Sequence, residues 1–438
     1  MKIPSLFTLK SQIKLDPQPV NSKNQLFIFG RNPELSLAEL CALYHTEESQ
    51  PNFVDLTIQG AITKSQKNPD ISKSGALLKQ ADIISQIFYE DFSDTILSTL
   101  IEHFNAEYVE DKSFWAISFY NRDRTSLTSG EFAQLSENFH LVVKTCLKKL
   151  KIRRTQRINE YQQDFLSPRK LKRKEVIERG FELIVWFQPE QIILAHTRKI
   201  IDIDEFARRD AKRLYRRPLL LLGLALARSM INLISIQENR HNLPVYDPFC
   251  GMGTIPAEAF LLGINAYGSD IDHDCVVQSR ENLQWLFQPK KYRRFSRFYE
   301  PNHIFEMDIT SPQSQIFPWE APFRGSIVAE TNLLTPRKTY PSRSEAIEMM
   351  HEFEYNYSRY ISGILSILPP MGVCVLVFPQ IHLKSHDRLQ FPIKEMLKGY
   401  NCRILSYTVN NLEIPAVFVH KWKNPIIERV IVVFQKAK

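Results

Sequence analysis

Hydrophobic and polar positions follow two different patterns along the chain, and the pattern changes near residue 243. Before that point, short strands of mixed polarity alternate with amphipathic helices, which is typical of small α+β layers. Ser36 and Thr128 each precede a glutamate by three residues, a capping-box spacing that predicts a helix start. The expected strands are 25–30, 53–59, 87–89, 114–120, 181–187 and 191–197, and the other expected helices are 72–84, 93–105 and 128–148.

After residue 243, continuous apolar runs of strand length alternate with helices. Such runs indicate strands that are covered on both faces, as in a mostly parallel sheet. The last two runs, 416–420 and 429–434, are joined by a link too short for a crossover, so they must pair antiparallel. The fold class predicted for this half is therefore α/β. Its earlier strands are expected at 244–249, 266–271, 303–308, 326–330 and 373–378.

Length and composition limit the class of protein. A chain of 438 residues predicts two or three domains, and a net charge of +8 suits a polyanionic partner. None of the six cysteines forms a C-x-x-C pair, which argues against a zinc site or a disulfide framework. The N-terminus lacks the apolar core of a signal peptide, and the apolar run 219–227 is too short to span a bilayer. We therefore expect a soluble cytoplasmic protein without a bound metal.

The strongest local signal is the octet DPFCGMGT at residues 247–254, which follows a strand and opens a helix. Gly251 and Gly253 let the backbone approach a ligand that a Cβ atom would block. Asp247 is placed to hold a charged amino group, Asp270 ends the next strand where ribose hydroxyls bind, and Asp308 is placed for an adenine amine. The predicted cofactor-binding residues are Asp247, Phe249, Gly251, Gly253, Thr254, Asp270, Ile271 and Asp308.

Two other interpretations of this octet are possible. A dinucleotide site requires a third glycine where Pro256 stands. A tight strand–helix turn without a ligand is the plainer alternative. The octet matches the first motif of class I methyltransferases better than a hydride-transfer fingerprint, so S-adenosylmethionine is the expected cofactor. Asp272 remains ambiguous between ribose binding and capping of the following helix.

With these motifs, the chain resembles the THUMP-containing tRNA guanosine-N2 methyltransferases, which modify guanosine 10 of tRNA. The resemblance extends over residues 27–40, 191–210, 228–233, the octet, GSDID at 268–272 and 418–432. It implies a Rossmann-like class I methyltransferase domain, with a mostly parallel seven-stranded sheet and an antiparallel C-terminal hairpin, preceded by α+β ferredoxin-like and THUMP domains. The expected divisions are a lead-in at 1–23, a ferredoxin-like domain at 24–120, a THUMP domain at 121–203, a linker at 204–222 and the methyltransferase domain at 223–438.

The catalytic loop departs from that family. The family motif is usually Asp-Pro-Pro-Tyr, whereas residues 330–336 read ETNLLTP, and the segment 220–227 lacks the family's lysine. The resemblance implies that Glu330, Thr331 and Asn332 line the target pocket, with Glu330 accepting amine protons and Tyr340 or Phe378 stacking on the base. The expected activity is methylation of the N2 amine of a tRNA guanosine. A catalytically degenerate tRNA-binding paralogue and a methyltransferase for another nucleic-acid amine remain alternatives.

Basic residues gather in two stretches that suit phosphate contacts. Residues 144–174 contain twelve lysines and arginines, and the connector 204–217 contains further arginines. A third basic group, at 290–297, is interpreted as an ordinary solvated surface insertion. The expected partner is tRNA, with no membrane, and no motif identifies a small activating subunit. The predicted RNA-binding residues are Lys170, Lys172, Arg173, Arg208, Arg209 and Arg213.

Overall fold

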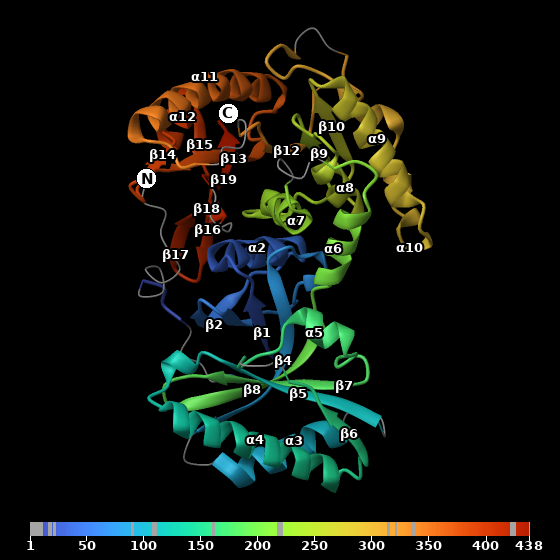
Figure 1. Cartoon of the computed structure of the whole chain (residues 1–438), viewed down its shortest axis with the longest axis vertical. Coiled ribbons are helices and arrows are strands. Elements are labelled where there is room, and N and C mark those ends of the chain that lie inside the picture. Colours follow the sequence, from blue (N-terminus) through green and yellow to red (C-terminus); the bar gives the residue numbers. More distant parts are fainter. Residues whose placement is uncertain are drawn as a thin grey trace.

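Two large sheets organise the chain, one in each half, and helix α6 (Ile203–Lys212) connects them (Figure 1). The computed structural model describes residues 12–15, 20, 23–88, 92–106, 112–159, 163–216, 222–312, 316–319, 322–333, 339–420 and 426–437. Within this part of the chain, no helix is long and apolar enough to cross a bilayer, and no cluster of three metal-ligating side chains occurs. All six cysteines are free thiols.

The first sheet has eight strands in the order β2-β3-β1-β4-β8-β7-β5-β6. Both predicted N-terminal domains contribute strands to it, because β4 and β8 pair antiparallel at its centre. The boundary near residue 120 therefore stays a prediction. The strands are β1 (Asn24–Phe29), β2 (Asn52–Thr57), β3 (Gly60–Lys64), β4 (Leu77–Phe88), β5 (Lys112–Tyr120), β6 (Arg154–Arg157), β7 (Gly180–Phe187) and β8 (Gln191–Ile200). The helices are α2 (Pro33–Thr46), α3 (Phe92–Ala106), α4 (Ser129–Lys149) and α5 (Pro168–Arg173).

Two predictions for this half were wrong, and two strands were missed. The expected helix at 72–84 is a short 3-10 turn followed by β4, since β1 and β8 pair with this segment on both sides. Ser36 does not cap a helix: α2 begins at Pro33, and Glu39 lies inside it, fully buried. Neither β3 nor β6 was predicted. The capping box at Thr128 and Glu131 is confirmed.

The second sheet is mostly parallel and Rossmann-like, as predicted, but within the described residues it has nine strands where seven were expected. Its order is β11-β10-β9-β12-β13-β19-β15, with β9 to β13 parallel and β19 antiparallel to β13. The strands are β9 (Val245–Asp247), β10 (Ala266–Asp270), β11 (Ile304–Glu306), β12 (Ser326–Glu330), β13 (Val373–His382), β14 (Arg388–Gln390), β15 (Cys402–Ile404), β18 (Val417–His420) and β19 (Ile427–Lys436), and β14 pairs antiparallel with the end of β13. The helices are α7 (Leu224–Asn232), α8 (Thr254–Leu261), α9 (His273–Phe287), α10 (Lys290–Arg293), α11 (Arg343–Ile367) and α12 (Ile393–Gly399).

The sheet ends in the predicted antiparallel pairing of β18 with β19, but the edge strand is interrupted. β15 and β18 pair with successive parts of β19, and between them the chain leaves as a hairpin of β16 (Ser406–Val409) and β17 (Leu412–Pro415). The hairpin reaches the N-terminal half, where the Asn410 side chain bonds to both the N–H and the carbonyl of Phe53, each at 2.8 Å. The interruption of the edge strand in the C-terminal half thus places the β16–β17 hairpin in contact with the N-terminal half.

A buried carboxylate on α2 completes this contact between the halves. Glu39 accepts hydrogen bonds from the backbone N–H groups of Gly75 and Ala76, at 2.8 and 2.7 Å, and from the Asn232 amide on α7, at 2.7 Å. Gly75 lies so close to α7 that a Cβ atom there would be 1.9 Å from the Ala225 carbonyl oxygen. The hydrophobic core is accordingly continuous from α2 through α7 to the second sheet.

The Glu39→Ala substitution is expected to lower the free energy of unfolding by about 2–4 kcal/mol, because several buried donors lose their acceptor together. Urea unfolding measures this change. Glu102→Ala, at an exposed position on α3, serves as the control and should stay within about 0.5 kcal/mol of the wild type. Equal effects of the two substitutions would contradict the role of Glu39.

Candidate cofactor and catalytic site

Three carboxylates meet where the parallel strands end. Asp247 ends β9, Asp270 ends β10 and Glu330 ends β12, and β9 lies between the other two strands. The carboxyl ends of parallel strands form one edge, which is where such sheets bind ligands. The structure therefore brings together three of the predicted site residues from segments that are far apart in the sequence.

The two glycines of the octet have different physical roles. Gly251 has a φ of +49°, and a Cβ atom there would meet nothing within 4 Å, so open space borders this side of the turn. Gly253 has a φ of +79°, and its Cβ would lie 2.3 Å from the Ser279 hydroxyl on α9. Gly253 thus permits close packing of α8 on α9, whereas Gly251 leaves room for a ligand.

Asp247 is buried beside the turn. Its carboxylate accepts a hydrogen bond of 3.0 Å from the Phe249 N–H. Burial, reinforced by the charges of Asp270 and Glu330, raises the pKa of Asp247 well above its usual range. Ionisation of this group is therefore unfavourable until a cation approaches, which makes the position suited to an amino group of a ligand.

Asp270 is oriented by backbone donors from both sides. The N–H groups of Gly251 and Asp272 donate to its two oxygens at 2.9 and 3.0 Å. Next to it, the Ile271 side chain is 67% exposed. A fixed carboxylate beside an exposed apolar side chain fits a ribose diol next to a flat base. Asp272 caps α9, accepting from the Asp274 N–H at 2.9 Å, so the capping alternative is confirmed and ribose binding by this residue stays a prediction.

Asp308, Phe249 and Thr254 lie around the same edge with partners of their own. β11 ends at Glu306, and the Asp308 carboxylate turns back to accept from the N–H and hydroxyl of Thr310, both at 2.8 Å. The Phe249 ring packs edge-on against Tyr360 on α11. The Thr254 hydroxyl, at the start of α8, accepts a hydrogen bond of 2.8 Å from Arg213.

Glu330 is held by an arginine that sequence reasoning missed. Arg429 on β19 reaches across β13 and donates two hydrogen bonds to the Glu330 carboxylate, one of them 3.4 Å long. Both side chains are mostly buried, at 18% and 11% exposure. Residues 330 and 429 are far apart in sequence, and only the order and register of β12, β13 and β19 bring them together. The sequence offers no local signal for this pair.

The rest of the catalytic loop is partly tied into the core. The buried Thr331 hydroxyl donates to Tyr357 at 2.6 Å, and Tyr357 donates to the Val377 carbonyl oxygen at 2.7 Å. Asn332 is exposed, whereas residues 334–338, including Pro336, lie outside the described part of the chain. Phe378 is fully buried against Tyr357 and cannot stack on a base, which corrects one expectation. Tyr340, 41% exposed, remains available.

The predicted RNA-binding residues separate into an exposed and a buried group. Lys172, Arg173 and Arg208 are exposed, and Lys170 is partly exposed. Arg209 and Arg213 have side chains only 7% exposed. Their burial corrects the expectation that they clamp phosphates at the surface.

Arg209 belongs to a buried charge cluster instead. It pairs with Glu258 on α8, which also pairs with Arg228 on α7 at 2.7 Å. Burial opposes ionisation of Glu258, but the two arginines lower the pKa of this carboxyl overall. The cluster therefore joins the connector α6 to both helices that flank the octet.

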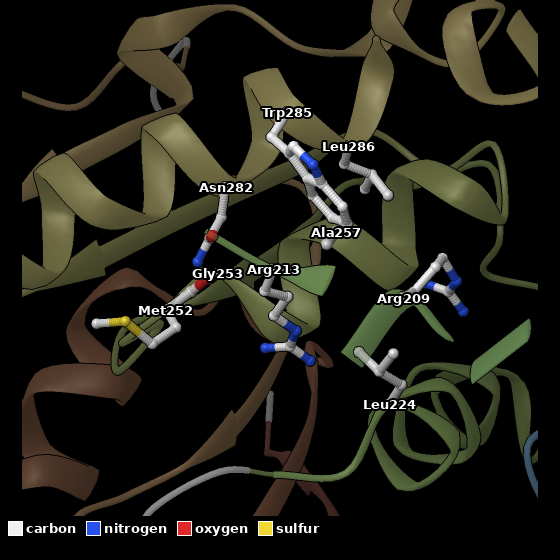
Figure 2. A pocket seen from close by; sticks show the side chains of 9 residues that line it. All are labelled: Arg209, Arg213, Leu224, Met252, Gly253, Ala257, Asn282, Trp285 and Leu286. Atoms are coloured by element: carbon white, nitrogen blue, oxygen red, sulfur yellow. Dashed lines mark hydrogen bonds between the residues drawn. The ribbon is translucent and has the colours of Figure 1, made fainter. Parts of the chain in front are cut away.

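A small pocket lies between this connector and the octet (Figure 2). The Arg213 side chain lies against the octet turn, and the Trp285 ring on α9 covers another side. Because α6 contributes part of the wall, the connector is packed directly against the candidate cofactor turn. The lining residues are Arg209, Arg213, Leu224, Met252, Gly253, Ala257, Asn282, Trp285 and Leu286.

Comparison with known proteins finds relatives of the segment that contains the octet. Residues 221–291, which contain the octet, match the family described as the RMKL-like methyltransferase domain. The chain is 36% identical over 98 residues to a tRNA (guanine(10)-N2)-dimethyltransferase from Methanothermobacter thermautotrophicus, an alignment that covers 22% of this chain and 27% of the relative. The predicted resemblance to tRNA guanine-N2 methyltransferases is thereby confirmed, although the aligned region spans only about a quarter of that relative.

Solved structures similar to the chain include two that match along nearly its whole length. TrmN from Thermus thermophilus has a TM-score of 0.49 and 16% identity, with 94% of this chain and 99% of that chain covered. A possible methylase from Clostridium difficile 630 has a TM-score of 0.44 and 15% identity, with 95% and 98% covered.

The raised pKa of Asp247 predicts a pH-dependent stability difference. Above the unfolded pKa of about 3.9, the folded protein binds more protons than the unfolded chain, so this group makes stability fall as the pH rises. Asp247→Asn removes that effect. The Tm of the variant minus that of the wild type should therefore increase between about pH 4 and pH 8, by at least about 2 °C. A pH-independent difference would contradict the assignment.

Proposed function

We propose that this chain, a relative of the tRNA guanine-N2 methyltransferases, transfers a methyl group from S-adenosylmethionine to the exocyclic N2 amine of a guanosine in tRNA, at position 10. The observation that carries the proposal is the edge where buried Asp247, the open turn at Gly251 and the backbone-held Asp270 lie beside Glu330. The methyltransferase-domain match over residues 221–291 includes the first three of these residues.

The residues at this edge fit the proposed cofactor. Asp247 would pair with the α-amino group of the cofactor, and Asp270 would bind its ribose hydroxyls. The open space beside Gly251 would let the protein backbone lie close to the cofactor. Ile271 would cover one face of the adenine, and Asp308 would receive the adenine amine. When bound, S-adenosylmethionine supplies a methyl group that its sulfonium has already activated. A positive ligand would also relieve the repulsion among the three carboxylates.

The main task of the protein is then to orient a weak nucleophile. The lone pair of a guanine N2 amine is delocalised into the ring, so alignment and exclusion of water contribute most to the rate. In the proposed arrangement, the Glu330 carboxylate accepts an amine N–H and turns the lone pair toward the methyl group. The Thr331 carbonyl and the exposed Asn332 complete the pocket, and Tyr340 is the available aromatic for stacking. Arg429 fixes the direction in which Glu330 points.

The N-terminal half would hold the RNA. In this proposal the N-terminal half comprises ferredoxin-like and THUMP domains, and the protein acts on tRNA in the cytoplasm. Lys170, Lys172, Arg173 and Arg208 are accessible enough to contact phosphates, which give affinity without reading sequence. The burial of Arg209 and Arg213 leaves these two residues a positioning role at the connector.

Methyl transfer to unmodified tRNA tests the proposal directly. With labelled cofactor, the wild type should label one guanosine at its N2 atom, and Glu330→Gln should lower kcat about 10²- to 10³-fold, because an amide is a weaker acceptor than a carboxylate. Glu413→Gln, on the exposed part of β17, is the matched control and should retain full kcat. Label on adenosine or on DNA would refute the guanosine assignment. So would the absence of label at a high concentration of the protein with saturating cofactor.

The pairing of Arg429 with Glu330 yields a separate prediction. Arg429→Gln should lower kcat about tenfold or more while leaving the KM for tRNA unchanged, and Arg429→Lys should restore part of the loss as a point charge. Because the two residues act as one unit, the Glu330→Gln/Arg429→Gln double variant should be little worse than Glu330→Gln alone. Arg403→Gln, which removes an arginine bonded to Gln435 toward the other end of β19, is the control. Additive losses would contradict the coupling.

A further inference from the structure

The segment between α9 and β11 has a three-residue repeat that its composition alone does not explain. Tyr292, Phe295 and Phe298 follow one another at intervals of three, and all three rings pack partly buried against the core. The segment consists of α10 and a 3-10 helix at Ser296–Phe298, in which side chains three apart lie on one face. The aromatic face is thus turned inward, and the intervening residues are turned to solvent.

Each of these rings carries the basic residue that precedes it. Lys291 lies over Tyr292 at 4.5 Å, Arg294 over Phe295 at 4.7 Å and Arg297 over Phe298 at 4.8 Å, measured to the ring centroids. These contacts restrain the long side chains, so less conformational entropy is lost when they bind a partner. A row of cations is therefore held outward on an aromatic support.

The positive charge of this row is largely uncompensated. Within the described part of the chain, Lys290, Arg293, Arg294 and Arg297 form no ion pair with a carboxylate, and all four are exposed. Like charges placed this closely repel one another, so these side chains do not stabilise the fold. An ordinary solvated helix face interleaves acids with bases. This arrangement instead suits a polyanion.

The remaining cation connects the row to the other basic elements. Lys291 pairs with both oxygens of Glu205 on α6, each at 2.8 Å. On the other side of α6, Asp204 pairs with Arg169 and Arg173 on α5, each at 2.7 Å. The elements α5, α6 and α10 consequently lie in succession along one side of the molecule, from the N-terminal half to the catalytic half (Figure 1).

We propose that residues 290–298 form an RNA-binding surface that grips the phosphate backbone of the tRNA substrate and extends the basic side of α5 and α6 onto the catalytic domain. This inference rests on the proposed function for the identity of the RNA. It replaces the interpretation of this stretch as a solvated insertion. A membrane surface is a poorer match, because the aromatic rings face the core and not the solvent.

The test uses the full-length protein and an unmodified tRNA transcript, with affinity measured by fluorescence anisotropy from about 50 to 200 mM salt. The variant K290Q/R293Q/R294Q/R297Q retains Lys291 and so keeps the contact with α6. Its matched control, R343Q/K384Q/K394Q/K398Q, removes four exposed charges on and around α11 and α12, on the other side of the catalytic domain (Figure 1). A charge-conserving variant, K290R/R293K/R294K/R297K, shows whether charge or fold is responsible for a loss.

The quadruple glutamine variant should bind tRNA at least about tenfold more weakly at low salt. The negative slope of log affinity against log salt concentration should also become less steep by about 2–3 than in the wild type. The KM for tRNA should rise, while kcat at saturating tRNA stays unchanged. The control and the charge-conserving variant should behave like the wild type.

Two results would contradict RNA binding by residues 290–298. One is an unchanged affinity and salt slope in the quadruple variant, and the other is an equal loss of affinity in the control. In either case methylation by the wild type would leave the proposed function standing. If instead the wild type binds tRNA without methylating it and the quadruple variant loses that binding, the proposed reaction fails and the surface stands.

Discussion

The burial of the Asp247 carboxyl group beside two other acids is the constraint on which the site depends. A carboxylate in such a place is costly to ionise, and Asp270 and Glu330 increase that cost. Each of the three carboxylates has different bonding partners. Backbone N–H groups hold Asp270, Arg429 neutralises Glu330, and Asp247 has a single hydrogen bond from Phe249. The edge is thus prepared for a ligand that carries its own positive charge, as S-adenosylmethionine does in the proposed function.

The same edge is fixed relative to the N-terminal half by buried and partly buried polar contacts. Glu39 joins α2 to α7, Asn410 joins the interrupted edge strand to β2, and Glu258 joins α6 and α7 to α8. Removing one partner from such a buried network leaves the others unsatisfied, so the network favours one arrangement of the two halves. In the proposed function, a fixed distance between the half that holds the RNA and the edge that binds the cofactor would select a nucleotide by its position in a folded RNA, and not by its neighbours in sequence.

Much of the catalytic half was predictable, because its apolar runs and its octet reflect local rules. The strand ending at Glu330 was predicted with its observed bounds, and the turn at Gly251 and Gly253 lies where the glycine spacing placed it. The N-terminal half was less predictable. Residues 77–84 form a central strand although a helix was predicted there, because β1 and β8 pair with this segment on both sides. Glu39 matched a capping spacing, yet its carboxylate serves a turn 35 residues later. Arg429, Arg209 and Arg213 obtained their roles from strand register and helix packing, which no local pattern encodes.

The central claim is that this edge binds a cationic adenosyl ligand through Asp247. Isothermal titration calorimetry of the wild type and of Asp247→Asn with S-adenosylmethionine, in buffers of different ionisation enthalpy, tests it most directly. The account predicts saturable binding at one site, with more proton release by the wild type than by Asp247→Asn, because a positively charged ligand favours ionisation of the Asp247 carboxyl group. Absence of binding at saturating ligand, or equal affinity and equal proton release in the two proteins, would contradict it.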